Sequence, residues 1–270
     1  MEMLSHTKEE EKAQKKKFVY KSSRDMTPLQ EQINAITVIP NVCYCLYFLL
    51  ARKWMSTEII ERVRESFSSV DETSFLWIQN MMECDPATIT PPLAVLAVAI
   101  GFILHTPFSF MYHWMCAHHL PPGVARIEHW SGRLDKSSIH VMSTCMSYAT
   151  SGSWKYFLVC AILNADCIYR QFLPEVRPRR NLIRIAVTLT ASIMPILWQG
   201  NALLFGKIYA VLTLMTWLFA KYPFGGWSHT AFHFAIMLLP PLLMTAACNL
   251  SSSRAQIQIA AMCVVLQEKM

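Results

Sequence analysis

The feature that most constrains this chain is a series of apolar stretches, each long enough to cross a lipid bilayer as a helix. A membrane-spanning helix needs about 20 mostly apolar residues to cross roughly 30 Å of hydrocarbon. The sequence predicts seven spans, at residues 33–51, 92–117, 134–152, 154–173, 182–198, 202–220 and 227–250. We therefore expect an all-α polytopic membrane protein, folded as a seven-transmembrane helix bundle.

Composition agrees with a membrane protein and excludes other classes. Of the 270 residues, 53% are hydrophobic and only 16% are charged, whereas a soluble domain has about 25% charged residues. The formal net charge is +6, but the basic residues are not interleaved with aromatic residues, so we expect no nucleic-acid partner. The nine cysteines show no CxxC spacing of the kind that binds metal, and those in apolar stretches are expected to be buried thiols.

The chain is expected to divide into three parts. Residues 1–32 are predicted to form a charged, disordered cytoplasmic tail, residues 33–250 the transmembrane domain, and residues 251–270 a C-terminal tail. The loop at 52–91 is predicted to contain an amphipathic helix that lies on the membrane surface. Its apolar residues at helical spacing are Ile59, Ile60, Val63, Phe67 and Val70.

Basic residues set the expected orientation of the bundle. Lys and Arg are concentrated in the amino-terminal tail and in the loops that follow the second and fourth spans. Because cytoplasmic loops carry an excess of Lys and Arg, we expect the N-terminus to be cytoplasmic and the C-terminus extracytoplasmic. The sequence leaves the organelle and the oligomeric state open.

Polar residues gather at corresponding ends of three predicted spans. The second span ends with Ser109 and His113, the third opens with Asp135, and the seventh opens with His229 and His233. Successive spans run antiparallel, so these ends lie on one side of the bilayer. Residues four apart share one face of a helix, and ionisable residues within spans are candidate functional residues. The third span is polar enough that we expect it to pack inside the bundle.

This combination of residues favours a zinc site. Three histidines, His113, His229 and His233, can hold Zn²⁺ and leave its fourth position to water, whose pKa zinc lowers to about 7. Asp135 could accept a proton from that water, and Ser109 could position the water or donate to a developing oxyanion. The alternative is that each histidine is an ordinary hydrogen-bonded residue of the bundle interior.

Other ionisable residues are weaker candidates. His118 and His119 adjoin the second span, but adjacent residues on a helix point about 100° apart and cannot easily face one metal. His105 is expected to be a packing residue. Glu128 lies in a loop and Asp166 lies in the middle of the fourth span, away from the predicted cluster.

The order Ser-x-x-x-His, Asp, His-x-x-x-His resembles the CREST superfamily of membrane metallohydrolases, nearest the progestin and adipoQ receptor and hemolysin III family. The stretch from Arg133 to Ile139, RLDKSSI, is similar to the hemolysin III pattern around its aspartate. The resemblance implies a seven-helix bundle in which His113, His229 and His233 hold zinc while Asp135 and Ser109 act on the zinc-bound water. Its members are linked to lipid amide hydrolysis or to lipid and hormone sensing.

The expected function is that of a zinc-dependent integral-membrane hydrolase, which cleaves a lipid amide or ester as a ceramidase does. The alternative is a hemolysin III or adipoQ-type receptor, in which zinc is structural and the protein senses a lipid or a peptide. A third hypothesis is a metal-free transporter whose histidines relay protons. In the first two, a membrane lipid is the expected substrate or ligand, and the residues alone do not decide between enzyme and receptor.

Overall fold

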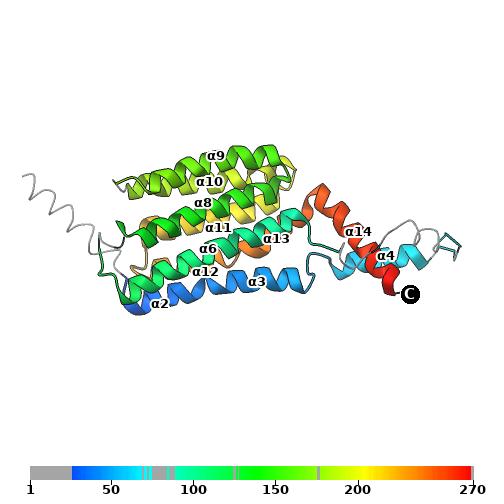
Figure 1. Cartoon of the computed structure of the whole chain (residues 1–270), viewed down its shortest axis with the longest axis horizontal. Coiled ribbons are helices and arrows are strands. Elements are labelled where there is room, and N and C mark those ends of the chain that lie inside the picture. The colour runs from blue at the N-terminus through cyan, green and yellow to red at the C-terminus, as the bar shows by residue number, and fades with distance from the viewer. Residues whose placement is uncertain are drawn as a thin grey trace, which may run out of the picture.

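The structure is a computed structural model that describes residues 26–68, 70–71, 73–74, 84, 89–123, 126, 128–174 and 177–268. Within these residues all regular secondary structure is helical, as predicted. Most of the predicted amino-terminal tail, residues 1–25, lies outside the described part of the chain. The helices form an elongated bundle, with a smaller pair of helices at one end (Figure 1).

Five helical segments are long and apolar enough to cross a membrane, which supports a multi-pass membrane protein. They are Pro28–Leu50, Leu93–His118 (α6), Pro178–Trp198 (α10), Ala202–Lys221 (α11) and Trp227–Asn249. The first and last consist of two helices each: α2 (Pro28–Thr37) with α3 (Ile39–Leu50), and α12 (Trp227–Ile236) with α13 (Leu239–Asn249). In both cases proline is the second residue of the later helix, where its missing N–H interrupts the helical hydrogen bonds.

Two further helices lie alongside these five in the bundle (Figure 1): α8 (Trp130–Ser151) and α9 (Trp154–Gln171). They coincide with the predicted third and fourth spans but fall outside the five apolar segments. α8 packs against α6, α9, α10 and α13, so this polar helix is enclosed as predicted. Its hydroxyls bond neighbouring backbone: Ser143 donates to the carbonyl of Thr188 at 3.0 Å, and Thr150 to that of Ser192 at 2.6 Å.

The first helix begins earlier than predicted. α2 begins at Pro28, inside the segment that we expected to be a tail. Thr27 and Gln30 form a capping box at its start, a motif that satisfies otherwise unpaired backbone donors. Polar residues of α2, including Glu31 and Asn34, are buried, whereas Leu29 and Ile36 are exposed. This inverted pattern suits a helix whose apolar side faces lipid and whose polar side faces a bundle interior.

The helix pair at the end of the bundle consists of α4 (Thr57–Ser68) and α14 (Ser251–Glu268). Phe67 of α4 packs against Val265 and Leu266 of α14, and a disulfide joins Cys84 to Cys263. The amphipathic helix predicted in the 52–91 loop is therefore present, and its apolar face packs against α14. The segment at 251–270, predicted to be a tail, is helical through Glu268 because it provides that cover. We call α4, α14 and the disulfide the α4–α14 module.

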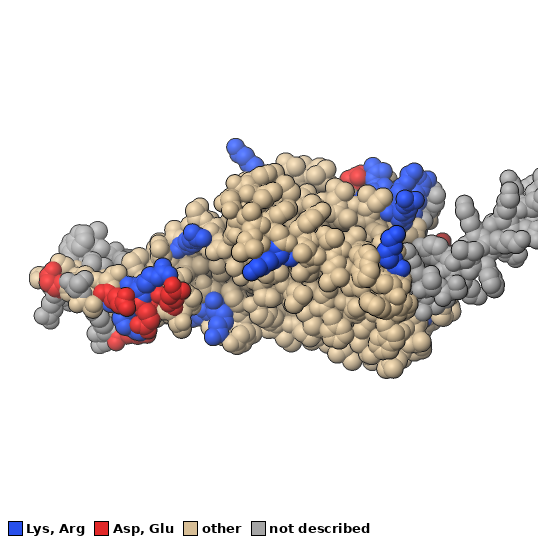
Figure 2. Space-filling view, turned by 180° about the vertical axis from the view of Figure 1, so that it is seen from behind, with Lys and Arg blue, Asp and Glu red and all other residues tan. Residues whose placement is uncertain are grey.

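Charge is distributed unevenly over the molecule. Figure 2 shows a largely uncharged bundle surface, with a group of Lys and Arg side chains at the end opposite the α4–α14 module. Four arginines at the end of α9 and the start of α10 are exposed: Arg170, Arg177, Arg179 and Arg180. An uncharged belt with charged ends is the surface expected of a membrane-embedded bundle.

Candidate metal centre

The structure brings together the three histidines that the sequence indicated. His113 lies near the end of α6, and His229 and His233 lie one turn apart on α12. The Nε2 atom of His113 is 3.4 Å from that of His229 and 3.1 Å from that of His233, and the last two are 3.2 Å apart. All three side chains are buried, and the group could hold a metal ion.

The three nitrogens cannot satisfy one another by hydrogen bonding. An imidazole nitrogen carries either a proton or a lone pair, so in a triangle of three such atoms at least one pair is alike and repels. The Nδ1 atom of His113 is 2.7 Å from Oε2 of Glu31, an acceptor that places the proton on Nδ1 and the lone pair on Nε2. The Nδ1 atoms of His229 and His233 have no hydrogen-bond partner in the described structure. A cation at the centre would remove the repulsion, because all three nitrogens could then present lone pairs.

The size of the triangle also suits a metal ion. A tetrahedral site with metal–nitrogen bonds of about 2.0–2.1 Å separates its ligand nitrogens by roughly 3.3–3.4 Å. The observed separations of 3.1 to 3.4 Å are close to this value. The donor set and its spacing therefore fit a bound ion.

The polar side of the site contains two residues that the sequence interpretation missed. Glu31 is fully buried, and Nη1 of Arg126 donates to its Oε1 at 2.9 Å. Glu31 falls in the segment predicted to be a tail, and Arg126 in a loop. The capping box at Thr27 could have revealed that a helix begins before Glu31, but no local pattern marks Arg126.

Aromatic rings also flank the site. The ring centroids of Phe219 and Phe232 lie 5.6 and 5.4 Å from that of His229, and the centroid of Phe232 lies 5.5 Å from that of His233. The ring of Tyr112 lies 5.0 Å from that of His113. Apolar side chains of α11 and α12 thus cover one flank of the site, and the carboxylate of Glu31 lies behind His113.

Ser109 and Asp135 lie in the surroundings of the histidines without bonding to them. Ser109 is buried one turn before His113. Asp135, in the second turn of α8, is half-buried and close enough to His105 and Tyr112 for electrostatic interaction. In the described part of the chain, no hydrogen bond joins Ser109 or Asp135 to the three histidines.

Two neighbours connect Asp135 with the centre electrostatically. His105 interacts with Asp135 and also with His233, and Lys136 interacts with Asp135 and also with His229. The Nδ1 atom of His105 is 2.8 Å from the hydroxyl of Ser138. Asp135 therefore belongs to the polar region around the centre, to which it is linked electrostatically through His105 and Lys136.

Comparison of the chain with models of known protein families, with curated proteins and with solved structures gave no match.

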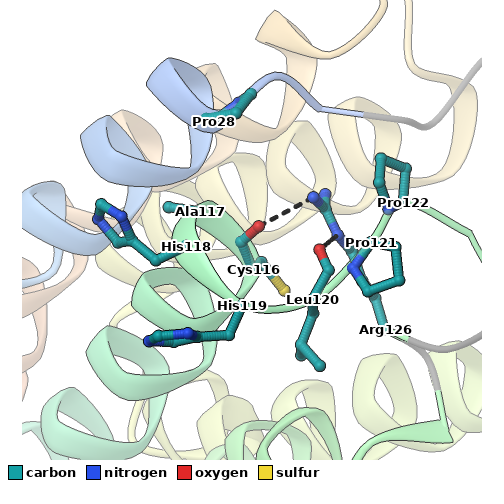
Figure 3. Close-up of a pocket in the computed structure, with 9 residues that line it drawn as sticks. All are labelled: Pro28, Cys116, Ala117, His118, His119, Leu120, Pro121, Pro122 and Arg126. Carbon is teal, nitrogen blue, oxygen red and sulfur yellow. Dashed lines mark hydrogen bonds between the residues drawn. The ribbon is translucent and has the colours of Figure 1, made fainter.

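Three other histidines lie away from the centre. His118 and His119 are exposed at the C-terminal end of α6, where they line an open pocket of about 330 Å³ together with Arg126 (Figure 3). His140 is buried on another face of α8, with its Nδ1 2.8 Å from Oδ1 of Asn164 on α9. None of these histidines belongs to the group of converging nitrogens.

The two acidic alternatives do not reach the centre either. Asp166 is exposed on α9 and accepts a hydrogen bond from Nε of Arg170 on the same helix at 2.7 Å. Glu128 is exposed in the connection before α8, and its backbone carbonyl accepts from Arg133. Neither residue can serve as an acid or base at the three histidines.

Proposed function

We propose that this protein is a zinc-dependent integral-membrane hydrolase that cleaves a lipid amide or ester, in the manner of the CREST metallohydrolases that its motifs resemble. The observation that carries the proposal is the buried triangle of Nε2 atoms from His113, His229 and His233, with separations of 3.1 to 3.4 Å. Three imidazoles with tetrahedral spacing are a donor set that zinc prefers. A zinc ion held there would supply Lewis acidity and a water with a pKa of about 7.

The surrounding residues would orient substrate and move protons. Asp135, which is half-buried in the polar region next to the histidines, would accept the proton released by the attacking water. Ser109 would donate to the oxygen that gains charge on the carbonyl. Phe219 and Phe232 would exclude bulk water from one flank and offer an apolar surface to a lipid chain.

We further propose seven membrane spans, with α8 and α9 added to the five apolar segments. The lengths of α8 and α9 and their position alongside α6 and α10 support this proposal (Figure 1). α8 is enclosed by four other helices, so its low hydropathy does not expose polar residues to lipid.

Two independent features support a cytoplasmic position for the metal centre. The disulfide between Cys84 and Cys263 lies in the α4–α14 module, at the opposite end of the bundle (Figure 1), and disulfides persist in oxidising compartments. The exposed arginines of α9 and α10 lie at the end that carries the centre, as the positive-inside rule requires of a cytoplasmic face. The N-terminus would then be cytoplasmic and the C-terminus extracytoplasmic.

One observation favours a receptor with a structural zinc ion as the second candidate. Within the described residues, neither Asp135 nor Ser109 forms a hydrogen bond to the histidine triangle. A structural zinc site needs no acid–base group beside the metal. The absence of these hydrogen bonds therefore suits a protein that senses a lipid or a peptide through its helices.

Metal content and turnover distinguish these candidates. We expect about one zinc ion per purified wild-type chain, substoichiometric zinc in His229→Ala, and wild-type zinc in His118→Ala, because His118 lies outside the triangle. Detergent-solubilised wild-type protein should hydrolyse a fluorescent ceramide or a matching ester lipid, and Asp135→Asn should retain zinc but lose turnover. Full zinc occupancy without hydrolysis of either lipid would favour the receptor, and substoichiometric zinc in wild type would contradict both.

A further inference from the structure

Arg126 is buried although it lies in the connection between α6 and α8. Its side chain is 8% exposed. Its guanidinium donates to the carbonyls of Leu120 at 3.1 Å and Cys116 at 2.9 Å (Figure 3), and to that of Met26 at 3.3 Å. With Glu31 as its fourth acceptor, this one side chain joins the end of α6 to the beginning of α2.

Glu31 uses each carboxylate oxygen for a different partner. Oε1 accepts from Arg126 at 2.9 Å, and Oε2 faces Nδ1 of His113 at 2.7 Å. A fully buried carboxylate is costly unless it is paired and hydrogen-bonded. Arg126 therefore supplies the positive charge that allows the Glu31 carboxylate to be buried next to Nδ1 of His113.

The orientation of His113 depends on this contact. Its Nε2 can present a lone pair to a metal only if the ring proton is on Nδ1, and Glu31 is the acceptor that holds it there. The flanking rings of Tyr112 and His233 restrict the imidazole sterically but accept no proton from Nδ1. The contact with Glu31 thus determines the tautomer, and Arg126 determines the position of Glu31.

We propose that Glu31 and Arg126 are positioning residues for the metal centre, through which the α6–α8 connection controls how tightly the three histidines bind a metal ion. This inference rests on the metal site of the proposed function. It adds that residues other than the three ligands set the metal affinity of that site. Neither residue touches metal or substrate. Arg126 acts only through Glu31, and Glu31 only through His113.

Cobalt(II) titration of the metal-free, detergent-solubilised full-length protein tests this proposal, because the visible d–d spectrum reports ligand geometry as well as occupancy. We expect Glu31→Gln and Arg126→Met each to weaken cobalt binding by about 10–100-fold, the range typical for loss of a partner of a metal-binding histidine. In the double variant the loss should equal that of Glu31→Gln alone, because Arg126 then has no carboxylate to position. Arg126→Lys, which keeps the charge, should recover part of the affinity.

Arg133→Met is the matched control. Arg133 also donates to backbone carbonyls, those of Glu128, Gln171 and Leu173, but it does not contact Glu31. Its loss should leave the cobalt spectrum and affinity unchanged.

The outcomes separate this inference from the proposed function. Wild-type cobalt affinity in a folded Arg126→Met or Glu31→Gln protein would overturn the inference, as would an equal effect of Arg126→Met in the presence and absence of Glu31. A wild-type protein that binds cobalt, and zinc, but hydrolyses no lipid would overturn the hydrolase and leave the positioning roles standing. A wild-type protein that binds no cobalt would overturn both.

Discussion

The Nδ1 atom of His113 lies 2.7 Å from the Oε2 atom of Glu31, although the two residues are 82 positions apart in the sequence. This contact joins the first helix of the bundle to a residue of the candidate metal centre. It gives the buried carboxylate a partner on each oxygen, together with Arg126. The stability of the first helix and the state of the centre should therefore be linked.

Replacing Glu31 by Leu should destabilise the metal-free protein by about 3–5 kcal/mol, because the buried guanidinium of Arg126 would lose its counter-charge. Thermal unfolding in detergent measures this change. Glu31→Leu combined with Arg126→Met should be markedly less destabilised than Glu31→Leu alone. If the double variant is the less stable of the two, the ion pair does not account for the effect.

Removal of metal should lower the unfolding temperature. A ligand that binds only the folded state at 100 times its Kd stabilises a protein by about 2.7 kcal/mol. Zinc added to chelator-treated protein should therefore raise the unfolding temperature of wild type and of His119→Ala. The same addition should have no effect on His233→Ala, because a corner of the triangle is missing. An equal shift in His233→Ala would place the bound zinc elsewhere.

Opening the disulfide should loosen the α4–α14 module and reveal the side on which it lies. Cys84→Ser leaves Cys263 unpaired, and loss of a native disulfide typically costs about 2–5 kcal/mol. A membrane-impermeant maleimide should then label Cys263 in intact cells or sealed vesicles from the extracytoplasmic face only. Wild type, in which Cys263 is paired, gives the background. Labelling from the cytoplasmic face alone would reverse the proposed orientation.

The contact between α6 and α8 should not tolerate a larger residue at Gly101. A Cβ atom there would lie 3.3 Å from Cβ of Cys145 and from Cγ of Met142. We expect Gly101→Val to destabilise the protein by about 1–3 kcal/mol, the usual cost of overpacking. Gly206→Val on α11 is the control, because no other part of the described structure beyond the adjoining turns of α11 comes within 4 Å of the added Cβ there. Equal melting temperatures for the two variants would show that the α6–α8 interface can expand.

The convergence of the three histidines could be predicted because the relevant information is local. Two of them are four residues apart on one helix, and antiparallel order alone places His113 at the same end of the bundle. Glu31 and Arg126 could not be predicted in this way, because their contacts join residues 82 and 95 positions apart. The charged residues before Ile33 resemble a solvated tail when they are seen without the helix that buries them.

The amphipathic helix at 57–68 shows a second limit of sequence patterns. A stripe of apolar residues predicts that one face of a helix is covered, and α4 has that stripe. The stripe does not specify what covers it. A membrane surface would select the same pattern as the apolar residues of α14, almost 200 positions later in the chain. The structure shows the contact with α14.

The disulfide between Cys84 and Cys263 also closes a covalent ring within the chain. The bridge spans 179 residues, so α6 to α13 belong to this ring, which contains all three histidines of the candidate metal centre. The first helix lies outside this ring and is tied to it laterally by side-chain contacts such as Glu31 with His113 and Thr230 with Asn34. A cut in the chain between Leu50 and Cys84 would therefore leave the histidines on one cyclic fragment and release their carboxylate partner as a separable peptide.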